Sequence, residues 1–222
     1  MVHIIYDLEM TVCRKKTHIS ETIEIGAVKV LEQNGKMEII DTFQSFIRPK
    51  LQVLSRATVE FTGITQADVD GAEAFDKVME RFLQWIGETE DYYLCSWGPD
   101  DKLQLTRDCR AHQMTMEWIR NHNNLQKHLN KLRKQEKHQQ MGLKAALDWL
   151  EIPFSGSQHR ALDDALNTAK IFLRLADDME LEKNEFDSET GEGEEVVYKT
   201  GSFSNNPFEK LAGMMGNEPF AG

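Results

Sequence analysis

Two acidic residues stand two positions apart at the end of the first apolar stretch. Residues 2–9 read Val-His-Ile-Ile-Tyr-Asp-Leu-Glu, which predicts a short, buried β-strand. Because side chains alternate across a strand, Asp7 and Glu9 should point to the same face. Two adjacent carboxylates at a buried strand end are costly unless a cation lies between them. The stretch therefore predicts either a divalent-cation site or a strand end that emerges into solvent, and alone it favours neither.

A third carboxylate, Asp164, occupies a position where a charge is unexpected. When residues 161–178 are placed on a helical wheel, Asp163, Asn167 and Lys170 share a polar arc. The wider, opposite arc is apolar, and Asp164 is the one charged residue in it. A core-facing aspartate is rarely tolerated without a cation or hydrogen-bond partners. Asp164 is therefore predicted to be a site residue, whereas Asp163 belongs to the solvated face.

Two more candidates lie near chain segments that should reach the same place. Asp100 directly follows the Gly98-Pro99 turn and suits a helix N-cap. Asp101 lies one turn before Leu105, on the side expected to face the sheet, at the end of a predicted strand. His159 precedes Asp164 by five residues, and a histidine there is a candidate general base because its ordinary pKa lies near neutrality.

The elements that must position these residues alternate between strands and helices. Strands are predicted at 2–9, 20–30, 37–47 and 92–97, with an Asn34-Gly35 hairpin turn between the second and third. Helices are predicted at 72–86, 100–111, 142–150 and 161–182. This order predicts an α/β domain with a mixed sheet flanked by helices.

The composition of the chain changes near its C-terminal end. The 222 residues suit one domain, predicted at 1–182, followed by an extension. Residues 183–222 are rich in Glu, Gly, Ser and Asn and predict a flexible acidic tail, a candidate docking segment for a protein partner. Residues 181–222 hold three Lys and nine acidic residues, so they carry −6 of the net charge of −11. The acidity therefore does not exclude a polyanionic substrate, although it argues against non-specific coating of duplexes.

The sequence also predicts the compartment. No apolar run approaches the length of a membrane span, and the N-terminal residues do not resemble a signal peptide. Cys13, Cys95 and Cys109 are widely spaced and odd in number, which predicts reduced thiols. We therefore expect a cytoplasmic protein with no membrane partner.

Taken together, Asp7-x-Glu9, Asp101 and His159-x-x-x-x-Asp164 resemble the ordered signature of the DEDDh 3′-5′ exonucleases. These are DnaQ-like enzymes with a ribonuclease-H-like fold, and the flanking wording is closest to the KapD / Eri-type exoribonuclease branch. Six segments within residues 1–176 carry the resemblance: Tyr-Asp-Leu-Glu-Met-Thr, Ile-Glu-Ile-Gly-Ala, Phe-Thr-Gly-Ile-Thr, Ser-Trp-Gly-Pro-Asp-Asp, Gly-Leu-Lys-Ala-Ala-Leu and His-Arg-Ala-Leu-Asp-Asp-Ala.

The resemblance implies an α/β ribonuclease-H-like fold with a mixed five-stranded sheet. It implies that Asp7, Glu9, Asp101 and Asp164 hold two divalent metal ions, Mg²⁺ or Mn²⁺, and that His159 is the general base. The family places an apolar residue four positions after its middle aspartate, and Leu105 in that position selects Asp101 over Asp100.

The resemblance also implies a substrate site. Residues predicted to border the 3′-terminal nucleotide, or else to be ordinary turn and core residues, are Met10, Thr11, Phe61, Thr62, Gly63 and Ile64. The expected function is a metal-dependent 3′-5′ exonuclease that releases nucleoside monophosphates from single-stranded 3′ ends, RNA in preference to DNA. The alternative is a regulatory or nucleic-acid-binding protein that retains the fold and acts through partners.

A basic stretch offers a second contact for nucleic acid. Residues 120–140 hold six Lys or Arg against one acid, Glu136. Such a stretch is either a solvated helix face or a local positive surface for the incoming strand. If it is the latter, reversing the charges of Lys131, Arg133 and Lys134 should lower the affinity for oligonucleotides and weaken its salt dependence.

Overall fold

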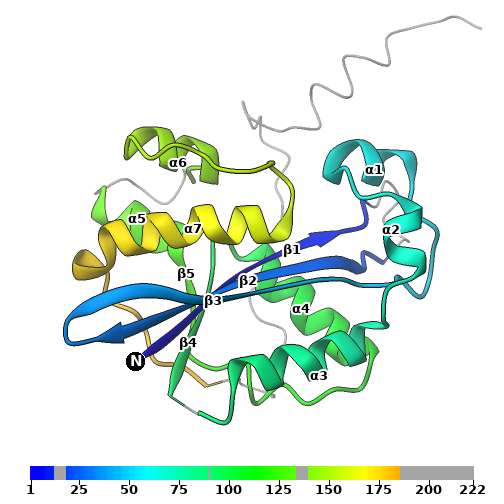
Figure 1. Cartoon of the computed structure of the whole chain (residues 1–222), viewed down its shortest axis with the longest axis horizontal. Helices are drawn as coiled ribbons and strands as arrows, with labels where there is room; N and C mark the ends of the chain where they lie inside the picture. The colour runs from blue at the N-terminus through cyan, green and yellow to red at the C-terminus, as the bar shows by residue number, and fades with distance from the viewer. Residues whose placement is uncertain (13–18, 90, 134–139, 186–222) are drawn as a thin grey trace, which may run out of the picture. The chain divides into compact units, whose positions relative to one another are not determined.

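The central strand β1 (Val2–Met10) organises a five-stranded sheet of order β3-β2-β1-β4-β5 (Figure 1). The computed structural model describes residues 1–12, 19–89, 91–133 and 140–185. β1 pairs with β2 in antiparallel and with β4 in parallel orientation, so the sheet is mixed, as expected. The other elements are β2 (Thr22–Gln33), β3 (Lys36–Phe46), α1 (Arg56–Thr62), α2 (Gln66–Asp70), α3 (Phe75–Ile86), β4 (Tyr92–Ser96), α4 (Asp100–Ala111), β5 (His122–Asn124), α5 (Leu125–Leu132), α6 (Leu143–Trp149), α7 (Ala161–Leu175) and a 3₁₀ turn, η1 (Ala176–Asp178).

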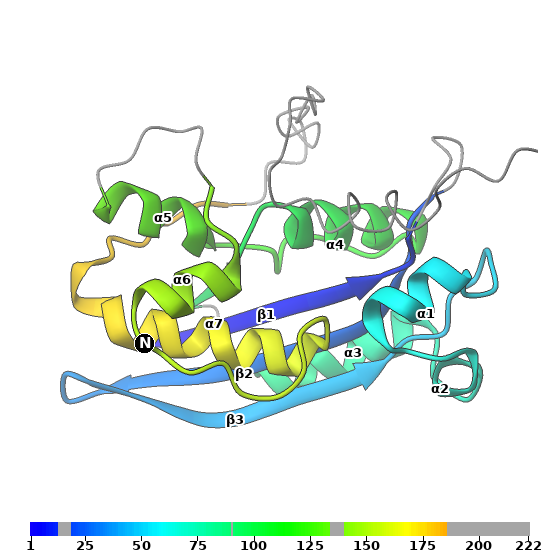
Figure 2. The ribbon, with the colours of Figure 1, turned by 90° about the horizontal axis from the view of Figure 1, so that it is seen from above.

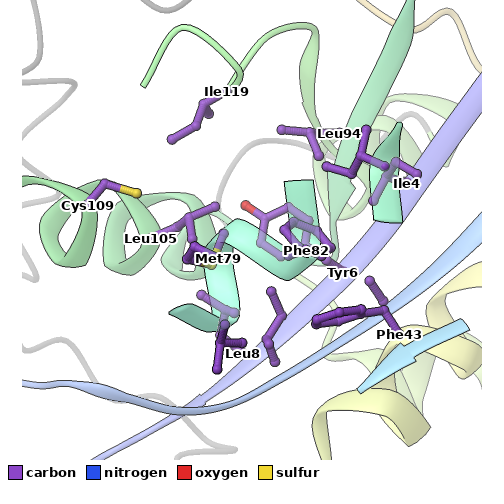
Figure 3. Packing of buried hydrophobic residues seen from close by; sticks show 14 of the residues in the cluster. Ile4, Tyr6, Leu8, Phe43, Met79, Phe82, Leu94, Leu105, Cys109 and Ile119 are labelled. Atoms are coloured by element: carbon purple, nitrogen blue, oxygen red, sulfur yellow. The ribbon is translucent and has the colours of Figure 1, made fainter. Parts of the chain in front are cut away.

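One face of the sheet packs against α3 and α4. The even-numbered side chains of β1, Ile4, Tyr6 and Leu8, join a buried cluster with Phe82 of α3 and Leu105 of α4, as Figure 3 shows. Every one of these five side chains is at most 5% exposed. Fully burying an aliphatic or aromatic side chain contributes about 1.5–3 kcal/mol, so this face anchors β1 firmly.

The opposite face of the sheet packs against α5, α6 and α7. Ile5 of β1 belongs to the cluster that includes Leu129 of α5, Ala146 of α6 and Phe172 of α7. Figures 1 and 2 show α6 and α7 side by side over this face of the sheet. The odd-numbered positions of β1 therefore point toward α7.

The sequence-based expectations for the long elements are confirmed, but several short elements were missed. α1 and α2 have only seven and five residues, too few to show a helical period. β5 reads His-Asn-Asn and lacks the apolar alternation that marks a strand. α7 ends at Leu175 rather than near Glu182, because Asp177 and Asp178 are unfavourable at the negative end of a helix dipole.

The chain after η1 returns to the sheet and lies against the outer edge of β5. Asn184 accepts hydrogen bonds from the backbone N–H of Asn121 (2.6 Å) through its carbonyl and from that of His122 (2.9 Å) through its side chain. Glu182 N–H donates to the side chain of Asn123 (2.8 Å). Asn184, which the sequence assigned to the tail, thus belongs to the compact unit, which spans residues 1–186. Residues 186–222 lie outside the described residues.

The remaining expectations about the chain concern thiols and membranes. Cys95 and Cys109 are buried free thiols, as predicted, and Cys13 lies outside the described residues. Within the described ranges, none of the helices combines the length and the apolar character that crossing a bilayer requires.

Candidate active site

β1 brings Asp7 and Glu9 to the face that packs against α7. They follow Ile5 at two-residue intervals, so all three side chains lie on one face of the sheet, as the alternation predicted. Glu9 is 5% exposed, and the β1–β2 register shifts directly after it. At the acidic end of β1, Glu9 is therefore buried and Asp7 is half-buried, so this end is not an open strand end in solvent.

α4 brings Asp101 to the same strand end. The Asp101 carboxylate is buried and accepts a hydrogen bond from the backbone N–H of Leu8 (3.1 Å), which lies between Asp7 and Glu9. Asp100 is exposed and is the first residue of α4; the N-cap is Pro99, so the prediction of an Asp100 cap was wrong. The fixed φ of proline is compatible with the start of a helix. Pro99 therefore takes the N-cap position, and Asp100 is the first helical residue.

The first turn of α7 and the loop before it bring Asp164 and His159. One potential metal-ligating atom from each of Glu9, His159 and Asp164 lies within 4.8 Å of the other two. The Asp164 carboxylate accepts a hydrogen bond from the backbone N–H of His159 (2.9 Å). The His159 ring packs on that of Phe61 in α1, with ring centroids 4.0 Å apart.

Of the α7 residues that the helical wheel placed on the polar face, Asp163 follows the prediction and Asn167 does not. Asp163 points away from the cluster and accepts a hydrogen bond from the Ser157 N–H (2.8 Å). Asn167, which the wheel placed on the polar face, is fully buried. Its side chain bonds to both the N–H and the carbonyl of Ser155, so the loop before α7 covers this part of the helix.

The electrostatics of the cluster favour neutral carboxyl groups. Burial, followed by the charges of Asp101, Glu9 and Asp164, raises the pKa of Asp7 well above its ordinary value. Burial, followed by the charge of Asp164, raises the pKa of Glu9 to about 9. Burial is also the largest cause that raises the pKa of Asp101 to about 7 and that of Asp164 to about 6.

These raised pKa values show that ionising the four carboxyl groups together is unfavourable unless a positive charge compensates them. The charges of Asp101, Glu9 and Asp164 each raise the pKa of Asp7, so the four carboxylates act on one another electrostatically. Their donor atoms are all oxygens, which suit hard divalent cations such as Mg²⁺ or Mn²⁺ better than zinc. The residues present therefore fit divalent metal ions.

Most of the residues predicted to contact substrate have structural partners. The Thr62 hydroxyl donates to the Thr58 carbonyl (2.9 Å), and Ile64 is 1% exposed within a small apolar cluster. Gly63 is the C-cap of α1, with a φ of 71° that glycine tolerates best. These observations favour turn and core roles for the side chains of residues 62–64.

The two residues that follow Glu9 are also engaged within the fold. Met10 packs against the cluster beneath α3 and α4. The Thr11 hydroxyl accepts a hydrogen bond from the Glu21 N–H (3.0 Å). A substrate role for these two residues stays a prediction, whereas Phe61 directly borders His159.

Sequence reasoning missed a buried ion pair beside the site. Glu24 of β2 is fully buried and pairs with Arg160 of α7's N-cap at 2.9 Å. The available signal was a single charge within Ile-Glu-Ile, in a strand that is apolar at both flanking positions. A charge in the middle of a strand buried on both faces requires a partner, just as Asp164 does in its helix.

The basic stretch is partly neutralised within the fold. Lys131 pairs with Glu182 (3.2 Å), and the Arg133 guanidinium lies 5.2 Å from the ring centre of Trp149. Lys134 lies outside the described residues. Binding of nucleic acid to this stretch stays a prediction.

A mixed sheet of order 3-2-1-4-5, with acidic residues at the end of β1 and in the first turns of α4 and α7, defines the ribonuclease-H-like fold of the DEDDh exonucleases. Residues 4–172 match the family model described as "Exonuclease", and the chain belongs to this family. The relatives that it resembles include Eri-type exoribonucleases.

Curated relatives and solved structures agree on this placement. The chain is 33% identical to mouse 3′-5′ exoribonuclease 1 over 75% of this chain and 50% of that protein. It is 32% identical to zebrafish ERI1 exoribonuclease 2, over 79% of this chain and 35% of that protein. The nuclease domain of 3′hExo, a DEDDh family member bound to rAMP, superposes with a TM-score of 0.74 at 29% identity, covering 83% of this chain and 96% of that domain. The chain spans about half the length, or less, of these curated relatives.

Proposed function

We propose that this protein is a metal-dependent 3′-5′ exonuclease that removes nucleoside monophosphates from single-stranded 3′ ends, RNA in preference to DNA. The observation that carries the proposal is the convergence of Glu9, His159 and Asp164 within 4.8 Å, beside Asp7 and Asp101, in a chain of the exonuclease family. The RNA preference is supported by relatives named exoribonucleases and by a similar structure titled as recognition of a histone mRNA stem-loop by a 3′-exonuclease.

Asp7, Glu9, Asp101 and Asp164 would hold two divalent ions, Mg²⁺ or Mn²⁺. Such ions, when bound, supply positive charge that favours ionisation of the attacking water and stabilises the leaving 3′ oxygen. The four carboxylates come from three separate elements, each anchored by its own core contacts. The protein thus holds the ligands in place before the ions arrive.

His159 would accept the proton of the attacking water at a ring nitrogen. Burial lowers the pKa of His159, so its imidazole is neutral near pH 7 and able to accept a proton. Contact with the Phe61 ring restricts the orientations of the imidazole. The nearby carboxylates of Glu9 and Asp164 would stabilise the imidazolium that forms.

The test is an end-specific cleavage assay on matched RNA and DNA oligonucleotides. A 3′-labelled single strand incubated with Mg²⁺ or Mn²⁺ should release labelled mononucleotide at once, RNA faster than DNA. EDTA or the substitution Asp7→Ala should abolish release, whereas the exposed control Asp178→Asn should leave it unchanged.

Two outcomes would contradict parts of the proposal. Equal rates on RNA and DNA would remove the RNA preference. Binding of oligonucleotides without metal-dependent cleavage would overturn the enzyme and favour a regulatory protein that retains the fold.

A further inference from the structure

Glu24 lies directly behind the predicted metal ligands but has no free hydrogen-bonding capacity. It faces Glu9 across the β1–β2 ladder and is fully buried. Its two oxygens accept four hydrogen bonds, from Arg160 Nε (3.1 Å) and Nη2 (2.9 Å), from the Ala161 N–H (3.1 Å) and from Gln44 Nε2 (2.7 Å). A carboxylate saturated in this way is a structural acceptor and not a further metal ligand.

These bonds hold the start of α7. The N-cap residue Arg160 makes no side-chain cap, so the first N–H groups of the helix need other acceptors. Glu24 supplies one of them from the neighbouring strand, through the Ala161 N–H. Two residues further along β2, a Cβ at Gly26 would lie 2.1 Å from the Leu162 nitrogen, so the helix start rests directly on the strand backbone.

The segment held in this way contains two predicted functional residues, His159 in the loop before α7 and Asp164 in its first turn. His159 has a φ of 62°, in the left-handed region that few residues other than glycine adopt. Such a conformation persists only where the surroundings enforce it. The Asp164 carboxylate binds the His159 N–H on one side, and Glu24 binds Arg160 and Ala161 on the other.

We infer that Glu24 and Arg160 are positioning residues: their ion pair fixes the segment 159–164 against β1, so that His159 and Asp164 meet Glu9. This inference deepens the proposed function and rests on it. The fork of the guanidinium suits the role because it bonds to both oxygens of Glu24 at once. The Phe46 ring, 5.3 Å from Arg160 Cζ, further restricts the fork.

The experiment compares Arg160→Lys, Arg160→Gln and the double variant Glu24→Gln/Arg160→Gln. Arg160→Gln alone leaves Glu24 buried without a counter-charge and should lower the melting temperature. The double variant removes both charges, so its melting temperature should recover toward the wild-type value. Arg160→Lys keeps the charge but loses the fork.

The readouts are Mn²⁺ affinity, followed by electron paramagnetic resonance, and kcat and KM on a 3′-labelled RNA. Loss of a residue that orients metal ligands typically costs about 10- to 100-fold in metal affinity or activity. We expect a loss of this size in Mn²⁺ affinity and kcat for Arg160→Gln and for the double variant, with a smaller loss for Arg160→Lys. KM should change little, since a positioning pair acts on the metal ligands and makes no contact with substrate.

Arg81 provides a matched control. It pairs with Glu73 (2.8 Å) and lies 5.6 Å from the Phe43 ring centre, so it reproduces the Arg160 arrangement at an exposed position far along the chain. Arg81→Gln should leave Mn²⁺ affinity and kcat unchanged.

Two results would overturn the inference. A double variant that regains wild-type Mn²⁺ affinity and kcat along with its stability would make the pair purely structural. A raised KM with unchanged Mn²⁺ affinity would make Arg160 a substrate contact instead. If the wild-type protein binds Mn²⁺ but cleaves no oligonucleotide, the proposed function fails, and Mn²⁺ affinity alone still decides the role of the pair.

Discussion

At the scale of single residues, the carboxylates of the candidate site weaken the fold that holds them. Burial disfavours the ionised form of Asp7, Glu9, Asp101 and Asp164, and each also repels the others. A metal ion would reverse both effects, because it replaces lost hydration and neutralises the repulsion. Stability and metal binding should therefore be coupled at every one of these positions.

Asp164→Asn tests this coupling at one carboxylate. Without metal and at pH 8, the variant should melt at a higher temperature than the wild type, because a buried repulsive charge is gone. It should also lose most of the rise in melting temperature that Mn²⁺ gives the wild type. Differential scanning fluorimetry in EDTA and in Mn²⁺ measures both, with the exposed Asp178→Asn as control. A variant less stable than the wild type in EDTA would contradict the expectation.

The pH dependence of stability follows from the same pKa shifts. The unfolded chain ionises these groups near their ordinary values of 3.8 and 4.5, whereas folded Glu9 keeps its proton to about pH 9 and Asp101 to about pH 7. Between the pKa that each group has in the unfolded chain and its higher pKa in the folded protein, the folded state binds more protons than the unfolded state. The stability of the folded state therefore falls as pH rises. The lowered pKa of His159 acts only below its ordinary 6.5, outside the upper part of this window.

We therefore expect the melting temperature in EDTA to fall between pH 7 and 8.5. One proton amounts to about 1.4 kcal/mol per pH unit, or roughly 3–5 °C for a domain of this size. Saturating Mg²⁺ should flatten the slope, and Glu9→Gln should remove the share that Glu9 contributes while leaving that of Asp7, whose pKa is also raised. A melting temperature that stays level in EDTA would show that Glu9 is ionised throughout this range.

At the scale of elements, the sequence predicted helices and strands correctly wherever one buried face gave them a regular repeat of apolar residues. The alternation of β1 predicted the shared face of Asp7 and Glu9, and the apolar arc of α7 singled out Asp164. Neither pattern predicted the Glu24–Arg160 pair. Arg160 precedes the amphipathic part of α7, and its partner is 136 residues away in the sequence. Contacts between distant elements, such as those of Asn167 with the loop at Ser155, leave no mark on a local pattern.

Gly26→Ala tests the contact between β2 and the start of α7. The added Cβ would meet backbone atoms of Ala161 and Leu162 at 2.1–2.4 Å, so the helix must shift. Overpacking of this kind costs about 1–3 kcal/mol or more, and the shift should also lower Mn²⁺ affinity. Gly71→Ala is the control, because nothing lies within 4 Å of its Cβ and its φ of −88° suits alanine. Urea denaturation and Mn²⁺ titration should show lower stability and lower Mn²⁺ affinity for Gly26→Ala than for Gly71→Ala. Equal stability and equal affinity of the two variants would refute the contact.

At the scale of the whole molecule, the last described residues of the compact unit pack back against the edge of its sheet. Residues 182–184 bond to residues 121–123 along the outer edge of β5, through six hydrogen bonds that join backbone and side-chain groups. An open strand edge otherwise invites pairing with other chains. The segment therefore protects the edge as well as extending the domain beyond residue 182.

Truncation separates this segment from the acidic tail. A chain of residues 1–185 should match the full chain in stability and nuclease activity, because every described contact is kept. A chain of residues 1–181 loses the six bonds and should be destabilised by about 1–3 kcal/mol, after the entropy of ordering three residues is deducted. Urea denaturation of both measures this. Equal stability of the two truncated chains would show that the segment contributes nothing to the fold.

The positions of β1 and α7 along the chain also bear on when the candidate site can assemble. Asp7 and Glu9 are synthesised before α7, which carries Asp164 and follows some 150 residues later. Until α7 packs onto β1, a nascent chain holds only part of the ligand set, however much of the sheet has formed. The proposed nuclease would therefore stay inactive until α7 has been synthesised and has packed onto β1.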